Sequence, residues 1–226
     1  MLHVWVNLAY LLASILFIVG LKQLSHPRTA VQGNTTSALG MLIGVVVTLL
    51  DRQIVDYKVL AAGLALGAVV GLVLAIRVPM TGMPQMVALL NGLGGGASFL
   101  VAGAALHEEV IRAAAGPAAD AASLSARFTI ATALSGLIGA VTWWGSLVAF
   151  GKLQGLITEK PVRLKGQYAL NILLLAACVV LTVMQVASPE QIWIYWVLVI
   201  AASVLGIMLV MPIGGADMPV VISLLN

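Results

Sequence analysis

The chain has 226 residues, of which 62% are hydrophobic and only 8% charged, and its formal net charge is +3. Soluble domains carry roughly 25% charged residues, so the composition excludes a soluble globular enzyme and predicts a polytopic membrane protein. The single cysteine, Cys178, and the scattered His3, His26 and His107 supply neither a disulfide framework nor a metal cluster.

Apolar runs long enough to cross a bilayer follow one another along the chain. A hydrocarbon core about 30 Å thick requires about 20 mostly apolar helical residues. The runs predict an all-α membrane bundle with seven complete transmembrane helices, at 4–21, 37–50, 59–76, 83–106, 128–150, 169–187 and 192–211, and an eighth that begins near Met218. The first run lacks a basic segment before it, so it is not a cleavable signal peptide.

The basic residues of the predicted loops indicate an orientation. With seven crossings, seven of the 11 Lys and Arg residues fall on one side of the membrane and four, including Arg52, on the other. The positive-inside rule then places the N-terminus outside and the Gly151 to Gln167 loop in the cytoplasm. This asymmetry accounts for the pI near 9.2 without a nucleic-acid partner.

Glycines recur where helices are expected to pack. Gly63, Gly67 and Gly71 repeat on one face of the third predicted helix, which predicts a packing seam. In the fourth helix the successive Gly94, Gly95 and Gly96 also offer small surface for packing. Because each glycine weakens a helix by about 1 kcal/mol relative to alanine, a hinge or a water-lined wall is the alternative for this segment.

No Asp, Glu, Lys, Arg or His falls in the middle of a predicted span, so a proton route built on intramembrane carboxylates cannot come from this chain alone. The polar groups that remain at membrane depth are amides and hydroxyls: Asn91, Asn226 and Ser203, and one helical stripe formed by Thr132, Ser135, Thr142 and Ser146. Such groups either line water or bond their own or a neighbouring helix.

The segment from Pro212 to Pro219 predicts a helix end, a turn at Gly214 and Gly215, and a new helix opened by Asp217. The Asp217 carboxylate suits the free N–H groups of a helix start. At a cytoplasmic mouth the same carboxylate is also placed to receive protons or to contact a soluble partner.

Three segments carry a resemblance to a known family: MPQMVALLN at 83–91, GSLVAFGKL at 145–153 and GGADMPVVISLLN at 214–226. They closely resemble the beta subunit of proton-translocating NAD(P) transhydrogenase, and the resemblance runs through nearly the whole chain. It implies an enzyme that transfers a hydride between NADH and NADP⁺ in soluble domains and couples this step to proton movement across a bacterial inner or mitochondrial membrane.

The resemblance also implies what this chain lacks. The NADP(H)-binding domain normally follows the last helix of the subunit, so residues 1–226 are expected to be the transmembrane domain alone, without the rest of the eighth helix. This domain is expected to have no catalytic residue and to bind no NADP(H), NAD(H) or metal. The expected partners are an alpha subunit, the chain's own NADP(H)-binding domain and the lipid bilayer, in a dimer of alpha–beta units.

Residue by residue, Asn91 matches a family position on the proton path where some members have histidine. Ser146 and Asn226 match further path positions, and Asp217, Gly214, Gly215 and Lys152 are implied in coupling at the cytoplasmic face. A secondary transporter and a structural membrane anchor are the alternative functions.

Overall fold

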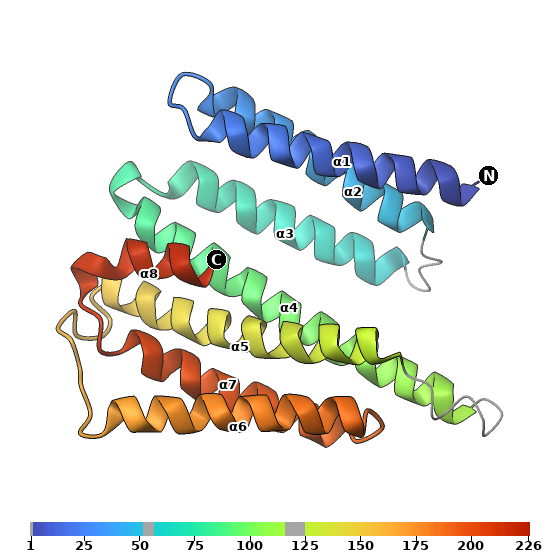
Figure 1. The fold of residues 1–226 in the computed structure, drawn as a ribbon. Coiled ribbons are helices and arrows are strands. Elements are labelled where there is room, and N and C mark those ends of the chain that lie inside the picture. The colour runs from blue at the N-terminus through green and yellow to red at the C-terminus, as the bar shows by residue number, and fades with distance from the viewer. Residues whose placement is uncertain (1, 52–56, 116–124) are drawn as a thin grey trace. The chain divides into compact units, whose positions relative to one another are not determined.

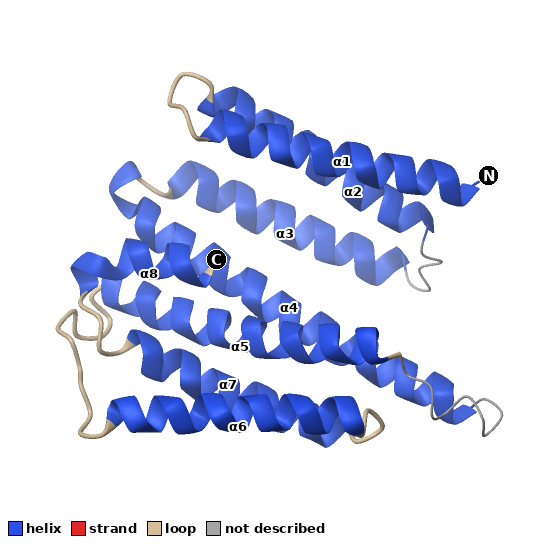
Figure 2. Cartoon of the chain, in the orientation of Figure 1, coloured by secondary structure: helices blue, strands red, loops and turns tan. Residues whose placement is uncertain are grey.

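The computed structural model describes residues 2–51, 57–115 and 125–226, and within these ranges every regular element is helical (Figures 1 and 2). The helices are α1 (Leu2–Leu24), α2 (Ala30–Asp51), α3 (Tyr57–Arg77), α4 (Met83–Ala115), α5 (Ala126–Leu153), α6 (Gln167–Ala187), α7 (Ile192–Val210) and α8 (Met218–Leu225). Seven of the described helices are long and apolar enough to cross a membrane. The predicted all-α membrane bundle is confirmed, and so is the start of the eighth helix.

Helices α2 and α4 extend furthest beyond the apolar runs that predict them. Helix α2 begins at Ala30 rather than at residue 37. In its added turns the Thr35 and Thr36 hydroxyls donate to the carbonyls of Val31 and Gln32, which satisfies these polar groups within the helix. Helix α4 continues past Leu106 to Ala115. Its last turns are polar, and there Arg112 forms ion pairs with Glu108 and Glu109. Arg52, which contributes to the charge asymmetry, lies outside the described residues.

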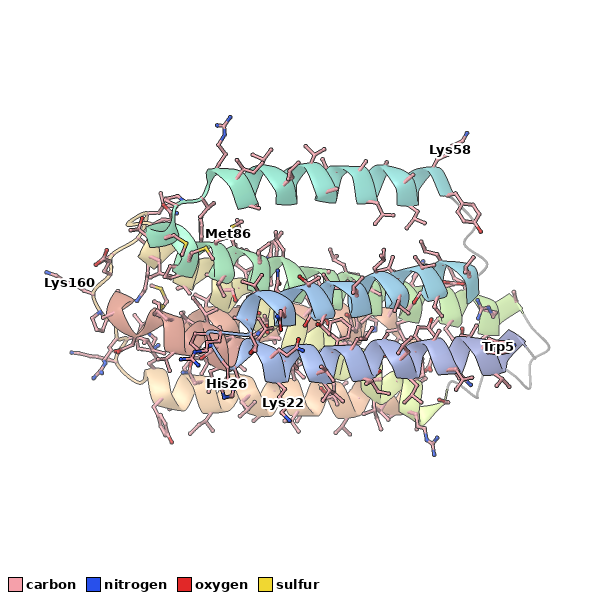
Figure 3. The ribbon with its side chains drawn as sticks, turned by 90° about the horizontal axis from the view of Figure 1, so that it is seen from above. Trp5, Lys22, His26, Lys58, Met86 and Lys160 are labelled. Atoms are coloured by element: carbon pink, nitrogen blue, oxygen red, sulfur yellow. The ribbon has the colours of Figure 1, made fainter. Side chains whose placement is uncertain are left out.

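Contacts divide the chain into two units, Met1–Ile76 and Arg77–Asn226. In the first unit α1 and α2 form an antiparallel hairpin that closes around small residues. A Cβ added to Gly33 would lie 2.7 Å from the carbonyl oxygen of Gly20, so the two backbones touch. In Figure 3, Trp5 lies at one end of α1, and Lys22 and His26 lie at the other end.

Helix α3 has no buried residue among the described ones. A Cβ added to Gly63, Gly67 or Gly71 would meet no described atom within 4 Å. The packing seam expected at these glycines therefore stays a prediction.

In the second unit α5 packs against α4 and α7 and also contacts α6 and α8. The core is built around Tyr195 of α7, which is fully buried and whose hydroxyl donates to the Phe99 carbonyl over 2.5 Å. A Cβ on Gly136 would lie 2.6 Å from the Tyr195 ring, and one on Gly103 would lie 2.9 Å from it. These two glycines thus make the space that brings α4, α5 and α7 together.

Helices α4 and α8 begin in the same way. A short 3-10 turn, Met80–Gly82 or Gly215–Asp217, leads directly into a Met-Pro pair. The residues that precede the two turns have nearly equal backbone angles, φ −71° and ψ 160° at Pro79 and φ −74° and ψ 156° at Gly214. Proline is well tolerated here because the first turn of a helix needs no N–H partner within the helix.

Candidate functional site in the α4–α5–α8 pocket

A pocket of about 450 Å³ lies between α4, α5 and α8. Its lining residues are Val87, Leu90, Asn91, Gly94, Gly95, Ser98, Ile138, Gly139, Thr142, Leu225 and Asn226. Most of this surface is apolar, and the exceptions are amides, hydroxyls and backbone. The pocket therefore brings Asn91 and Asn226 to one place from helices far apart in the sequence.

The Asn91 side chain joins α4 to α5. Its Nδ2 donates to Ser146 Oγ over 2.9 Å, and Ser146 is fully buried. One turn earlier in α5, Thr142 Oγ1 donates to the carbonyl of Leu225 over 3.1 Å, which holds α8 against the pocket. Two successive polar groups of α5 thus bind the two helices that carry the asparagines.

The predicted glycine segment of α4 divides between two roles. Gly95 packs against α5, because a Cβ there would lie 2.7 Å from the Gly139 carbonyl oxygen. Gly96 lies under the Trp143 ring, 2.6 Å from an added Cβ. Gly94 meets no described atom within 4 Å and faces the pocket. Gly95 and Gly96 therefore make packing surface, whereas Gly94 leaves an open wall.

The four hydroxyls expected on one stripe of α5 do not act together. Thr132 Oγ1 bonds the carbonyls of Phe128 and Thr129 in its own helix, over 3.1 and 3.0 Å. The backbone carbonyl of Ser135 accepts a bond from Ser98. Of the stripe, Thr142 lines the pocket and Ser146 binds Asn91.

Lys152, in the last turn of α5, ties the end of α7 to the pocket region. The side chain is 0% exposed, and its Nζ donates to the carbonyls of Met211 and Ile213 over 2.7 Å each. No described carboxylate pairs with it. The ammonium lies instead at the C-terminal ends of α5 and α7, where helix dipoles favour a cation.

The loop after α5 reinforces this junction. The Glu159 carbonyl accepts from Gly215 N over 2.9 Å, and the Met211 carbonyl accepts from Val162 N over 3.1 Å. A Cβ added to Gly214 would lie 3.7 Å from the Pro161 ring. The predicted coupling residues Lys152, Gly214 and Gly215 thus come together in the segment between α7 and α8. We call this segment, with the bonds that hold it, the tied junction.

Asp217 occupies the N-cap position of α8, but its side chain makes no capping hydrogen bond and is exposed. The carboxylate-to-N–H bonds expected from the sequence are therefore not formed. Its exposure leaves the carboxylate accessible at the end of the unit that carries the tied junction.

Sequence reasoning missed two amides that hold the same region. Gln85 Nε2 donates to the Leu153 carbonyl over 2.9 Å and joins α4 to the end of α5. Gln167 is buried, and its Nε2 donates to the Met208 carbonyl over 2.7 Å. The available signal was a glutamine at the start of an apolar run, a position that equally suits a lipid interface.

The fold and the pocket define a polytopic membrane protein with a polar site between helices and a tied junction at one end of it. A family model described as NAD(P) transhydrogenase beta subunit matches residues 6–226, and the chain belongs to that family. Two curated relatives, both named NAD(P) transhydrogenase subunit beta and both from Rhodospirillum rubrum, one of them from a specified strain, are each 43% identical over 227 positions. These alignments cover 100% of this chain but 48% of each relative, so the chain spans about half their length.

Proposed function

We propose that this chain is the proton-translocating membrane domain of an NAD(P) transhydrogenase. It couples hydride transfer between NADH and NADP⁺, which takes place in soluble domains, to proton movement across the bacterial inner membrane. The observation that carries the proposal is the Asn91–Ser146 hydrogen bond beside the α4–α5–α8 pocket, which Asn226 also lines, in a chain of this family.

Neither asparagine nor serine holds a transferable proton at neutral pH. In this proposal the two asparagines and Ser146 orient water, and water or a residue of a partner chain carries the proton. A pocket of about 450 Å³ accommodates several water molecules, since each occupies about 30 Å³ in the liquid. The proposed partners are the alpha subunit and the chain's own NADP(H)-binding domain, in a dimer of alpha–beta units.

The tied junction supplies the route for coupling. The N-terminus is placed outside and the loop after α5 in the cytoplasm, where the exposed Asp217 meets the NADP(H)-binding domain. A displacement at Asp217 moves α8, since Asp217 directly precedes it. Helix α8 in turn carries Leu225, whose carbonyl accepts from Thr142, and the pocket residue Asn226.

NADH-driven proton pumping by the complete complex in liposomes tests this proposal. Asn91→Leu is expected to abolish pumping while the soluble domains still transfer hydride, because the side chain no longer orients water. Asp217→Asn is expected to uncouple the two activities without unfolding the protein.

The matched control is Ser203→Ala, because the Ser203 hydroxyl bonds only the Val199 carbonyl of its own helix among the described residues. This variant should pump normally. Undiminished pumping by Asn91→Leu would refute the assigned path. An inactive native complex would reopen the transporter and anchor functions.

A further inference from the structure

A second pocket lies where α6 begins, away from the asparagines. It has a volume of about 430 Å³, and Arg163, Leu164, Tyr168, Asn171 and Pro212 are among its lining residues. Gly166, with φ 78°, makes the left-handed turn that leads from the loop into α6. Since α6 is a 21-residue apolar helix that spans the membrane from Gln167, this pocket lies at the level of the lipid headgroups.

The side-chain charge of this pocket is positive and comes from Arg163, which lines it, is exposed and pairs with no described carboxylate. Lys165 is exposed in the same loop but does not line the pocket. Glu159 is the acidic residue of the loop. Its side chain lies against Gly215, and it forms no ion pair with a described residue. The N-terminal end of α6 adds the positive end of its dipole. The pocket is therefore suited to an anionic group.

An apolar ridge leads from the same pocket along α6. Tyr168 lines the pocket and is 82% exposed. Ile172, Leu175 and Val179 follow at helical spacing on the same face and are also exposed. Exposed tyrosines are enriched at the membrane interface, with their rings at the headgroup level. A basic pocket continued by an apolar ridge matches a molecule with an anionic head and a hydrocarbon chain.

Asn171 adds a polar requirement. It lines the pocket, and its buried Oδ1 has no hydrogen-bond partner among the described residues. Buried polar atoms are normally paired. When the Asn171 amide rotates toward the pocket, its Oδ1 can accept a hydrogen bond from a headgroup that carries a hydroxyl as well as a phosphate.

We propose that this pocket binds the headgroup of an anionic phospholipid. The phosphate lies against Arg163 and the start of α6, and an acyl chain follows the ridge from Tyr168 to Val179. An acidic surface of the NADP(H)-binding domain is a different occupant for the charge of Arg163, and the test below separates it from a lipid headgroup. Lipid binding at this pocket does not depend on hydride transfer or on proton pumping. An experiment can therefore refute the lipid site without refuting the proposed proton translocation, and the reverse.

Native mass spectrometry of the purified complete complex tests the lipid site. The probe is phosphatidylglycerol in mixed micelles, with phosphatidylcholine as the zwitterionic reference. Arg163→Gln is expected to weaken phosphatidylglycerol binding about fivefold, as for one basic residue near an anionic surface, and to leave phosphatidylcholine unchanged. Lys160→Gln is the matched control, since Lys160 belongs to the same loop, does not line the pocket and extends away from the ribbon in Figure 3.

Two results would overturn the proposal. The first is equal phosphatidylglycerol binding by the native complex and Arg163→Gln; weaker cross-linking of that variant to the NADP(H)-binding domain would then assign the charge to that domain. The second is displacement of the bound lipid by millimolar inorganic phosphate, which would make the pocket a site for free phosphate.

Discussion

At the scale of single residues, the site depends on one hydrogen bond between neutral side chains. Ser146→Ala removes the acceptor of Asn91 Nδ2, and a hydrogen bond of this kind contributes about 0.5–1.5 kcal/mol to stability. We expect a lower melting temperature and fewer protons pumped per hydride transferred. Ser203→Ala breaks a bond within its own helix and no other bond to a described residue, so it should preserve the pumping ratio. An unchanged ratio in Ser146→Ala would show that Asn91 orients water without this partner.

At the scale of helices, the α4–α5 crossing depends on reciprocal glycines. A Cβ on Gly139 would lie 2.7 Å from the Gly95 carbonyl oxygen, and a Cβ on Gly95 would lie 2.7 Å from that of Gly139. Overpacking of this kind costs typically about 1–3 kcal/mol, so Gly95→Ala should lower the thermal unfolding temperature of the complex. Gly94→Ala meets no described atom and should be neutral or stabilising. Equal melting temperatures for these two variants would contradict the observed crossing.

The junction between α7 and α8 makes a separate prediction at this scale. Lys152→Met replaces the unbranched stem of the side chain as far as Cε but leaves the carbonyls of Met211 and Ile213 without their donor. Each unpaired acceptor costs about 1–3 kcal/mol, so proteolysis of the loop after α5 should become faster. Lys160→Met, at an exposed position of that loop, is the control. A native rate in Lys152→Met would mean that water replaces the ammonium.

At the scale of the whole molecule, the distribution of basic residues predicts one orientation. Lys160→Cys should react with a membrane-impermeant maleimide in inverted vesicles but not in intact cells, and Arg112→Cys should show the opposite pattern. Cys178 is the single native cysteine and is buried, so background labelling should be low. Reversed accessibility of the two positions would invert the topology and place Asp217 outside.

The membrane spans are predictable because the length of an apolar run is a local property of the sequence. Partners of the helices are not, since lipid-facing and protein-facing surfaces have similar composition. Tyr195 shows this limit: nothing near it in the sequence indicates that Gly103 and Gly136 make room for its ring. Asn91 was predictable as a buried amide, but its bond to Ser146 requires the packing of two helices.

The shared beginning of α4 and α8 has a consequence for depth in the membrane. Both helices begin at the same end of the second unit in Figure 1. Each then runs from its Met-Pro pair to a Leu-Leu-Asn sequence at the same offset, from Met83 to Asn91 and from Met218 to Asn226. With a rise of about 1.5 Å per residue, each amide lies about 12 Å along its helix from the starting methionine. The two amides therefore lie at one depth from that end of the unit, where both line the same pocket, and a water molecule entering from there would meet both at that depth.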